Sequence, residues 1–98
     1  MKQGDFLQEK LDNFKNHIKT CLKPVELRSK KVHENIEFIL KFSLDDWLEF
    51  ASKHLVPYQD DLDSATKEII ELYDLDVNEE QKHKIKRYLE LFIDCLTK

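Results

Sequence analysis

Residues 43–57 read SLDDWLEFASKHLVP and show most directly which secondary structure this chain favours. Ser43 and Asp46 have the spacing of a helix capping box, in which each side chain accepts a hydrogen bond from the other residue's backbone. The apolar residues that follow recur three and four positions apart, which places them on one face of a helix. Pro57 cannot continue a helix, so the sequence predicts one that begins after Ser43 and ends at Val56. Its inward face consists of Leu44, Trp47, Leu48, Ala51 and Leu55.

Two more helices are predicted before this one, and Pro24 separates them. The first runs from Asp5 to about Leu22, because the residue that precedes a proline is pushed out of the helical conformation. The second begins with Pro24 at its first position and ends at about Phe42. Five apolar residues of the second helix are expected to face inward: Val25, Val32, Ile36, Ile39 and Leu40.

Two further helices are predicted towards the C-terminus. One runs from about Tyr58 to Tyr73 and has an acidic first turn, which suits the positive end of a helix dipole. The last begins after a capping residue, for which Asp76 and Asn78 are the two candidates. Apolar residues cover more than half of the circumference of its second half, so we expect this last helix to be central.

Glycine and proline are rare in this chain, which has one glycine and two prolines in 98 residues. A β-rich domain needs many tight turns, and those turns draw on both residue types. Gly4 lies near the N-terminus, so no glycine is available inside the fold for a phosphate-binding loop or a nucleophile elbow. With short connections between the helices, the sequence predicts one all-α domain over residues 1–98. We expect a single up-and-down bundle of four to five antiparallel helices.

The N-terminal residues contain no long apolar stretch of the secretory kind, and no segment approaches the ~18 apolar residues of a membrane span. We therefore expect a cytoplasmic protein that does not enter a membrane. In that compartment the two cysteines are expected to be reduced and to act as small apolar residues.

Charge is distributed unevenly along the chain. Residues 1–42 contain six acids and nine bases, residues 43–79 contain eleven acids and two bases, and residues 80–98 contain three acids and five bases. The middle third therefore has a balance of −9, while the chain as a whole has −4. The two helices of residues 43–79 should form an acidic hairpin. One interpretation is that this hairpin lies between the basic helices and neutralises them.

The other interpretation is that the hairpin is an electronegative surface that steers a basic partner protein to it. The sequence then predicts a small protein-binding regulator or inhibitor without catalytic activity and without a cofactor, either a monomer or a homodimer. Aromatic residues beside the acids are candidate anchors, because aromatic side chains often dominate the binding energy of an interface. The predicted partner-binding residues are Asp45, Asp46, Trp47, Glu49, Phe50, Tyr58, Asp60, Asp61 and Asp63.

Two alternative functions compete with this prediction. The basic segments 19–31 and 82–87 could hold the phosphates of a nucleic acid, although the acidic net charge and the absence of aromatic residues between the bases make this unfavourable. The chain could instead associate with itself through Phe38, Leu91 and Ile93 if the bundle leaves them exposed. Phe38 and Phe50 lie off the main apolar stripes, so they either widen the core, which we expect, or lie exposed in a partner patch.

Two cysteines and a histidine offer either a zinc site or a disulfide between Cys21 and Cys95, although nothing in the sequence requires one. His17 and Cys21 lie four residues apart on one helix, so both side chains can reach the same point. In an up-and-down bundle of five helices the first and last helices run in the same direction, which would bring Cys95 to the same end. His17, Cys21 and Cys95 are thus an alternative set of ligands, weighed against a boundary histidine and two buried thiols.

Overall fold

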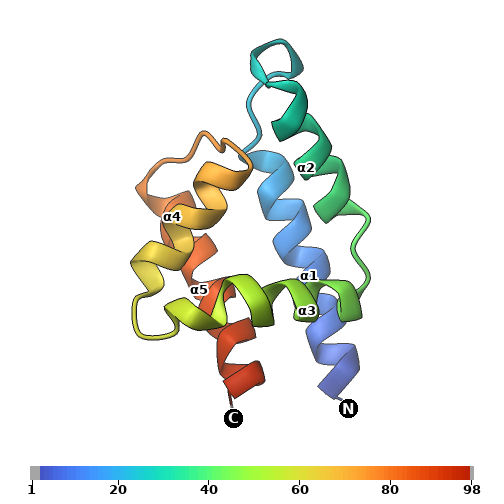
Figure 1. Cartoon of the computed structure of the whole chain (residues 1–98), viewed down its shortest axis with the longest axis vertical. Helices are drawn as coiled ribbons and strands as arrows, with labels where there is room; N and C mark the ends of the chain where they lie inside the picture. Colours follow the sequence, from blue (N-terminus) through green and yellow to red (C-terminus); the bar gives the residue numbers. More distant parts are fainter. Residues whose placement is uncertain (1–2, 98) are drawn as a thin grey trace.

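The computed structural model describes residues 3–97, and it contains helices and connecting segments but no strand in that range (Figure 1). The predicted all-α helical bundle is confirmed. Its Cα radius of gyration is 13.0 Å, the value expected for a compact chain of this length. The elements are the α-helices α1 (Gln3–Thr20), α2 (Lys30–Leu40), α3 (Leu44–His54), α4 (Leu62–Leu72) and α5 (Glu79–Thr97), with the short 3₁₀ turns η1 (Val25–Leu27) and η2 (Val56–Tyr58).

Helix α5 occupies the centre of the molecule, as its apolar circumference predicted. It packs against α1, α3 and α4. Four of its residues are buried, and they are Ile85, Leu89, Phe92 and Ile93. From α1 the buried residues are Leu7, Leu11, Phe14 and Ile18, so one face of α1 supplies the opposite wall of the core.

The direction of the helices differs from a regular up-and-down order. Figure 1 shows that α3 runs across α1 and α5 instead of lying along them. In a regular up-and-down bundle of five helices, α1 and α5 would run in the same direction. Because α3 lies across the bundle, α1 and α5 instead run in opposite directions, and both chain ends lie at the lower end of the view. A hydrogen bond agrees with this arrangement, since Nε2 of His17, near the end of α1, lies 3.1 Å from the carbonyl oxygen of Gln81, near the start of α5.

Helices α3, α4 and α5 begin with side-chain caps, of which the sequence predicted those of α3 and α5 but not the Asp61 cap of α4. At α3, Ser43 Oγ accepts from the Asp46 amide at 3.1 Å and Asp46 Oδ2 accepts from the Ser43 amide at 3.2 Å, which completes the capping box. Asn78 and Gln81 exchange the same pair of bonds at the start of α5. Of the two candidates, Asn78 is therefore the cap. At α4, Asp61 accepts from the Ser64 amide.

The start of the second helix was predicted wrongly. Pro24 has ψ of 147°, and Arg28 is also extended, so the segment between them forms only the turn η1. Helix α2 begins at Lys30 because Ser29 caps it, with Oγ accepting from the Val32 amide at 3.1 Å. As a result Val25, predicted to face inward, is 61% exposed.

The predicted α3 and α4 differ from the observed helices only near Pro57. Helix α3 ends at His54. Pro57 lies in the first positions of η2, where a proline is compatible with the short 3₁₀ turn. Helix α4 accordingly begins at Leu62 instead of Tyr58. The connection between them remains short, so the acidic residues of both helices stay close along the chain.

The end of α4 is closed by a Schellman motif that lacks the usual glycine. The amide of Leu75 donates to the Ile70 carbonyl at 2.9 Å, and that of Asp74 donates to the Glu71 carbonyl at 3.3 Å. Asp74 takes the left-handed conformation, with φ of 46°, and its carboxylate lies 3.0 Å from Lys23 Nζ. This ion pair ties the α4–α5 connection to the end of α1.

Candidate functional site

The structure places the predicted partner-binding residues on α3, η2 and the start of α4, as the sequence suggested. The six acids among them are exposed, and Phe50 and Tyr58 are partly buried. Trp47 is an exception, since it is completely buried. Its ring lies 5.2 Å from that of Phe14 and 5.4 Å from that of Phe92, so Trp47 belongs to the core and is not available to a partner.

Several of the acids are engaged within the chain. Asp46 caps α3 and Asp61 caps α4. Glu49 pairs with Lys53 at 3.1 Å, and Asp63 pairs with Lys86 of α5 at 2.9 Å. The Asp63–Lys86 ion pair between α4 and α5 supports the neutralisation interpretation for this part of residues 43–79. The expected hairpin is not formed, because within residues 3–97 α3 and α4 meet through η2 and do not pack along one another. Within residues 3–97, Asp45 and Asp60 have no ion pair.

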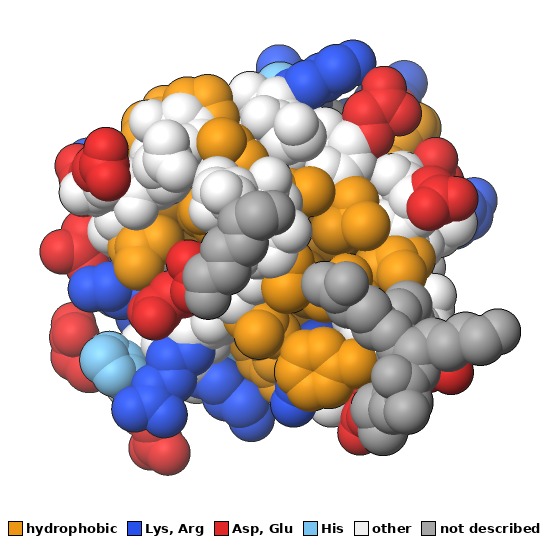
Figure 2. Space-filling view, turned by 90° about the horizontal axis from the view of Figure 1, so that it is seen from below, with side chains coloured by type: hydrophobic (Ala, Val, Ile, Leu, Met, Phe, Trp, Pro, Cys, Tyr) orange, Lys and Arg blue, Asp and Glu red, His pale blue; other side chains and the backbone are white. Residues whose placement is uncertain are grey.

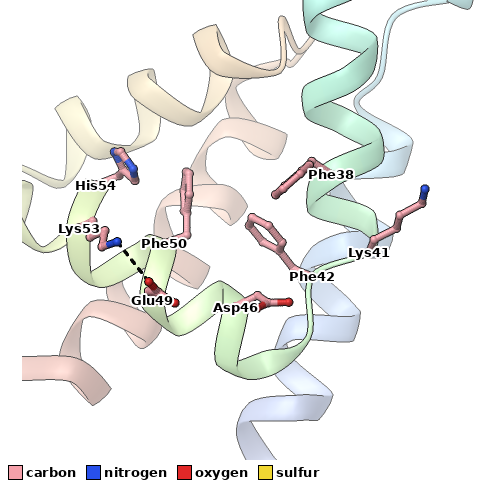
Figure 3. A pocket seen from close by; sticks show the side chains of 8 residues that line it. All are labelled: Phe38, Lys41, Phe42, Asp46, Glu49, Phe50, Lys53 and His54. Atoms are coloured by element: carbon pink, nitrogen blue, oxygen red, sulfur yellow. Dashed lines mark hydrogen bonds and ion pairs between the residues drawn. The ribbon is translucent and has the colours of Figure 1, made fainter.

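A groove of about 410 Å³ lies between the end of α2 and α3 (Figure 3). We call it the α2–α3 groove. Three phenylalanine rings form a row along it: Phe38 and Phe42 have ring centroids 5.4 Å apart, and Phe42 and Phe50 have centroids 5.9 Å apart. Charged and titratable side chains surround this row, and they are Lys41, Asp46, Glu49, Lys53 and His54.

Phe38 is the most exposed of these rings, at 68% of its surface. The prediction that it widens the core was therefore wrong, while Phe50 does pack on the core by stacking on Trp47 with centroids 5.6 Å apart. The reason is the position of α2, whose buried residues are Ile36 and Ile39 only. The rings of Phe38 and Phe42 pack in a T-shaped arrangement.

Polar contacts fix the position of α2 and hence of the aromatic row. Lys15 of α1 donates to the carbonyl oxygen of Phe42, just after the end of α2. Asn35 Nδ2 donates to the Leu72 carbonyl oxygen at the end of α4 at 3.3 Å. The shape of the α2–α3 groove is therefore fixed by contacts of α2 and Phe42 with two other helices, α1 and α4.

Comparisons with known proteins add nothing to this geometry. The chain matches no family model, and no curated protein or solved structure is similar to it at a significant level. Function has to be inferred from the surfaces of the chain itself. Among the described residues, no helix combines the length and apolar character needed to cross a membrane.

The alternative zinc ligands do not come together. Nε2 of His17 lies 3.9 Å from Cys21 Sγ, but Cys95 lies near the far end of α5, because α1 and α5 run in opposite directions. The same histidine nitrogen contacts the Gln81 carbonyl oxygen. Within residues 3–97, no three His, Cys, Asp or Glu side chains are arranged to hold a metal ion. Cys21 and Cys95 are both free thiols.

The three residues suggested for self-association differ in exposure, so they do not form one surface. Ile93 is 2% exposed and cannot contact a second copy. Leu91 is partly buried, and only Phe38 is freely exposed. Of this set, Phe38 alone remains a candidate contact, and it lies in the α2–α3 groove.

Asp61 provides a test of whether the acidic residues of segment 43–79 stabilise the fold. Hydrogen bonds from the Ser64 hydroxyl, and then from the Ser64 amide, hold the pKa of Asp61 below its ordinary value of 3.8. The ionised form is therefore favoured by folding, and its stabilisation is present above pH 3.8 and lost as the pH falls through the lowered pKa. We expect Asp61→Asn to be less stable than the wild type at pH 7, with a difference that shrinks at about pH 3.

Urea denaturation of both proteins at the two pH values measures this difference. Asp60→Asn is the matched control, because Asp60 is an exposed neighbour outside the Ser64 hydrogen bonds, and it should show no such change with pH. A constant difference for Asp61→Asn from pH 7 to pH 3 would contradict the prediction.

Proposed function

We propose that this protein is a protein-binding domain that regulates or inhibits its partner, and that it docks through the α2–α3 groove and the acidic edge of α3. The observation that carries the proposal is the exposed ring of Phe38 at the end of an ordered aromatic row. Large exposed apolar side chains that gather in a hollow are typical of interaction sites. No catalytic role is part of the proposal.

The aromatic row is suited to bind because little of it has to become ordered. Phe42 and Phe50 are already packed on one another, and Phe50 is stacked on the buried Trp47. A partner side chain that enters the groove therefore meets rigid rings, which lowers the entropic cost of binding. Aromatic anchors in such positions tend to supply much of the binding energy.

The chemistry of the partner is indicated by the charges beside the row. Asp45 and Asp46 lie on the first turn of α3, and Glu49 lies one turn further on. Lys53 offsets part of this charge through its pair with Glu49. The partner expected is a protein segment with an apolar side chain for the groove and lysine or arginine residues beside it.

Affinity capture with two matched variants tests the site. Phe38→Asp places a charge in the groove, whereas Leu27→Asp makes the same kind of change at a residue of equal exposure, 67% against 68%, on η1. We expect a partner captured by the wild type to be retained by Leu27→Asp and reduced at least about tenfold by Phe38→Asp, since a tenfold loss needs only about 1.4 kcal/mol. Quantitative mass spectrometry of the captured proteins measures both.

A second pair of variants tests the charge. Asp45→Lys combined with Glu49→Lys should weaken capture, while Glu26→Lys combined with Glu71→Lys should not, and neither pair disturbs the Ser43–Asp46 capping box or the Asp61 cap. Melting curves confirm that the variants fold. Equal capture by Phe38→Asp and the wild type would overturn the proposal. A loss of dimer on sedimentation of Phe38→Asp, with no other protein captured, would assign the groove to self-association.

A further inference from the structure

A second groove, of about 680 Å³, lies between α1 and α5. We call it the α1–α5 groove. It shares no residue with the α2–α3 groove, so a role for it is independent of the proposed function. Residues from both ends of the chain line it, and they are Phe6, Lys10, Glu80, His83, Lys84, Arg87, Tyr88 and Leu91.

The charge in this groove is opposite to that of the chain as a whole. Three cationic side chains, Lys10, Lys84 and Arg87, face one acid, Glu80, in a protein whose net charge is −4. Figure 2, which views the end of the molecule near the termini, shows Lys and Arg side chains gathered with a histidine beside a band of hydrophobic side chains. A concave surface of one sign concentrates ligands of the opposite sign.

Aromatic rings lie among these cations. The Nζ atom of Lys10 is 5.3 Å from the centroid of the Phe6 ring, so a cation and a planar apolar face occupy the same part of the groove. Tyr88 is held on its inner side by Phe14, at 5.5 Å between ring centroids, and by His17, at 6.2 Å. Spacing along the sequence did not indicate this arrangement, because Phe6 and Lys10 come from a helix distant in the chain from Arg87 and Tyr88.

We propose that the α1–α5 groove binds single-stranded nucleic acid, with Lys10, Lys84 and Arg87 on the phosphates and Phe6 and Tyr88 against the bases. Proteins that bind single strands combine a positive groove for the backbone with aromatic side chains on which bases stack. An acidic peptide would use the cations but leave both rings without a matching planar group. The volume is sufficient for a nucleotide unit, and the open groove lets the strand continue beyond it.

Fluorescence anisotropy with a labelled oligothymidylate of about 12 nucleotides tests the proposal on the full chain, because bound single strands span roughly 4–16 nucleotides. Binding at low salt is expected to weaken as salt rises. For three phosphate contacts on a single strand, the slope of log K against log salt concentration should be about −2. No binding at low salt would overturn the proposal.

Two matched double variants locate the site. Lys84→Glu with Arg87→Glu reverses two exposed cations in the groove, and Lys30→Glu with Lys31→Glu reverses two exposed cations at the start of α2. Both variants change the net charge equally. We expect the first to weaken binding at least about tenfold and to bring the slope to about −0.7 or closer to zero, and the second to change binding less than about threefold. An equal loss of binding in both variants would show that the oligonucleotide is attracted non-specifically to positive charge, and would overturn the assignment of the site.

The role of the rings separates a nucleic acid from an acidic peptide. Phe6→Leu should weaken oligothymidylate binding by about fivefold or more, whereas Phe38→Leu, which removes an exposed ring elsewhere, should not change it. Polyglutamate of equal length should compete poorly with the oligonucleotide. If polyglutamate binds as tightly through Lys84 and Arg87, or if Phe6→Leu has no effect, the groove is an acidic-peptide site and the proposal is wrong.

Discussion

Trp47→Ala is expected to lower the free energy of unfolding by about 3–5 kcal/mol, the range for removing a large buried aromatic side chain. Trp47 has no exposed surface, and its ring contacts Phe14 of α1, Phe92 of α5 and Phe50 of α3. A cavity at this point separates three helices that otherwise share one aromatic cluster. Because small domains are stable by about 5–15 kcal/mol, the variant should lose a large fraction of its stability.

Urea denaturation measures the change, and thermal melting should show a fall of at least about 12 °C, since each kcal/mol corresponds to about 4–8 °C here. Ser52→Ala on the exposed side of α3 is the control and should be nearly neutral. Trp47→Phe gives a sharper test. Trp47 Nε1 is buried without a hydrogen-bond partner in the described part of the chain, a cost of about 1–3 kcal/mol that phenylalanine removes.

We therefore expect Trp47→Phe to retain most of the stability that Trp47→Ala loses, although it also removes one ring of the indole. If both variants are equally unstable, the shape of the indole matters more than its unpaired N–H group. If Trp47→Ala loses less than about 1 kcal/mol, the aromatic cluster is not the centre of the core.

Asp74→Val is expected to have the second largest effect, a loss of about 2 kcal/mol. Asp74 has φ of 46° in the Schellman motif, where aspartate is tolerated but a β-branched residue is strongly disfavoured. The variant also removes the ion pair with Lys23, whose partly exposed groups make it worth about 0–1 kcal/mol. Distortion of the motif would disturb Leu75, which is buried directly after it.

Two further variants separate these contributions. Asp74→Gly removes the same ion pair but suits the left-handed conformation, so it should be more stable than Asp74→Val by at least about 1 kcal/mol. Lys23→Met removes only the ion pair and should cost less than about 1 kcal/mol. Urea denaturation of the three proteins gives the comparison. Equal stability of the glycine and valine variants would mean that backbone conformation does not limit this position.

The sequence predicted the helix starts correctly where a single local pattern determines them. Ser43 and Asp46 form the expected capping box, and Asn78 starts the last helix, because both patterns depend on residues within a single turn. The start of α2 was missed because two local signals conflict there. Pro24 is compatible with a helix start, but Ser29 supplies a cap with a hydrogen bond, which Pro24 has no side chain to form.

The candidate sites were predictable only in part, since both grooves depend on how helices cross. Acidic side chains on α3 were expected at the surface, and they are there. Spacing correctly placed Trp47 on the inward face of its helix, so the same pattern argued against Trp47 as a partner anchor. The exposure of Phe38 results from the position of α2, which short-range spacing does not specify. The rings of the α1–α5 groove could not be predicted from spacing either, because Phe6 lies on α1 and reaches Lys84 and Arg87 of α5 only through the packing of the two helices.

The packing of α1 against α5 also affects how the chain folds during synthesis. Helix α1 is synthesised before α5, so Phe14 can contact Tyr88 and Phe92 only after α5 has left the ribosome. Part of its apolar face is therefore open to chaperones or to aggregation until α5 has been synthesised. Contacts of this sequence separation also slow the folding of an otherwise helical chain. Because α5 packs against α1, α3 and α4, the core can close only after α5 has been synthesised.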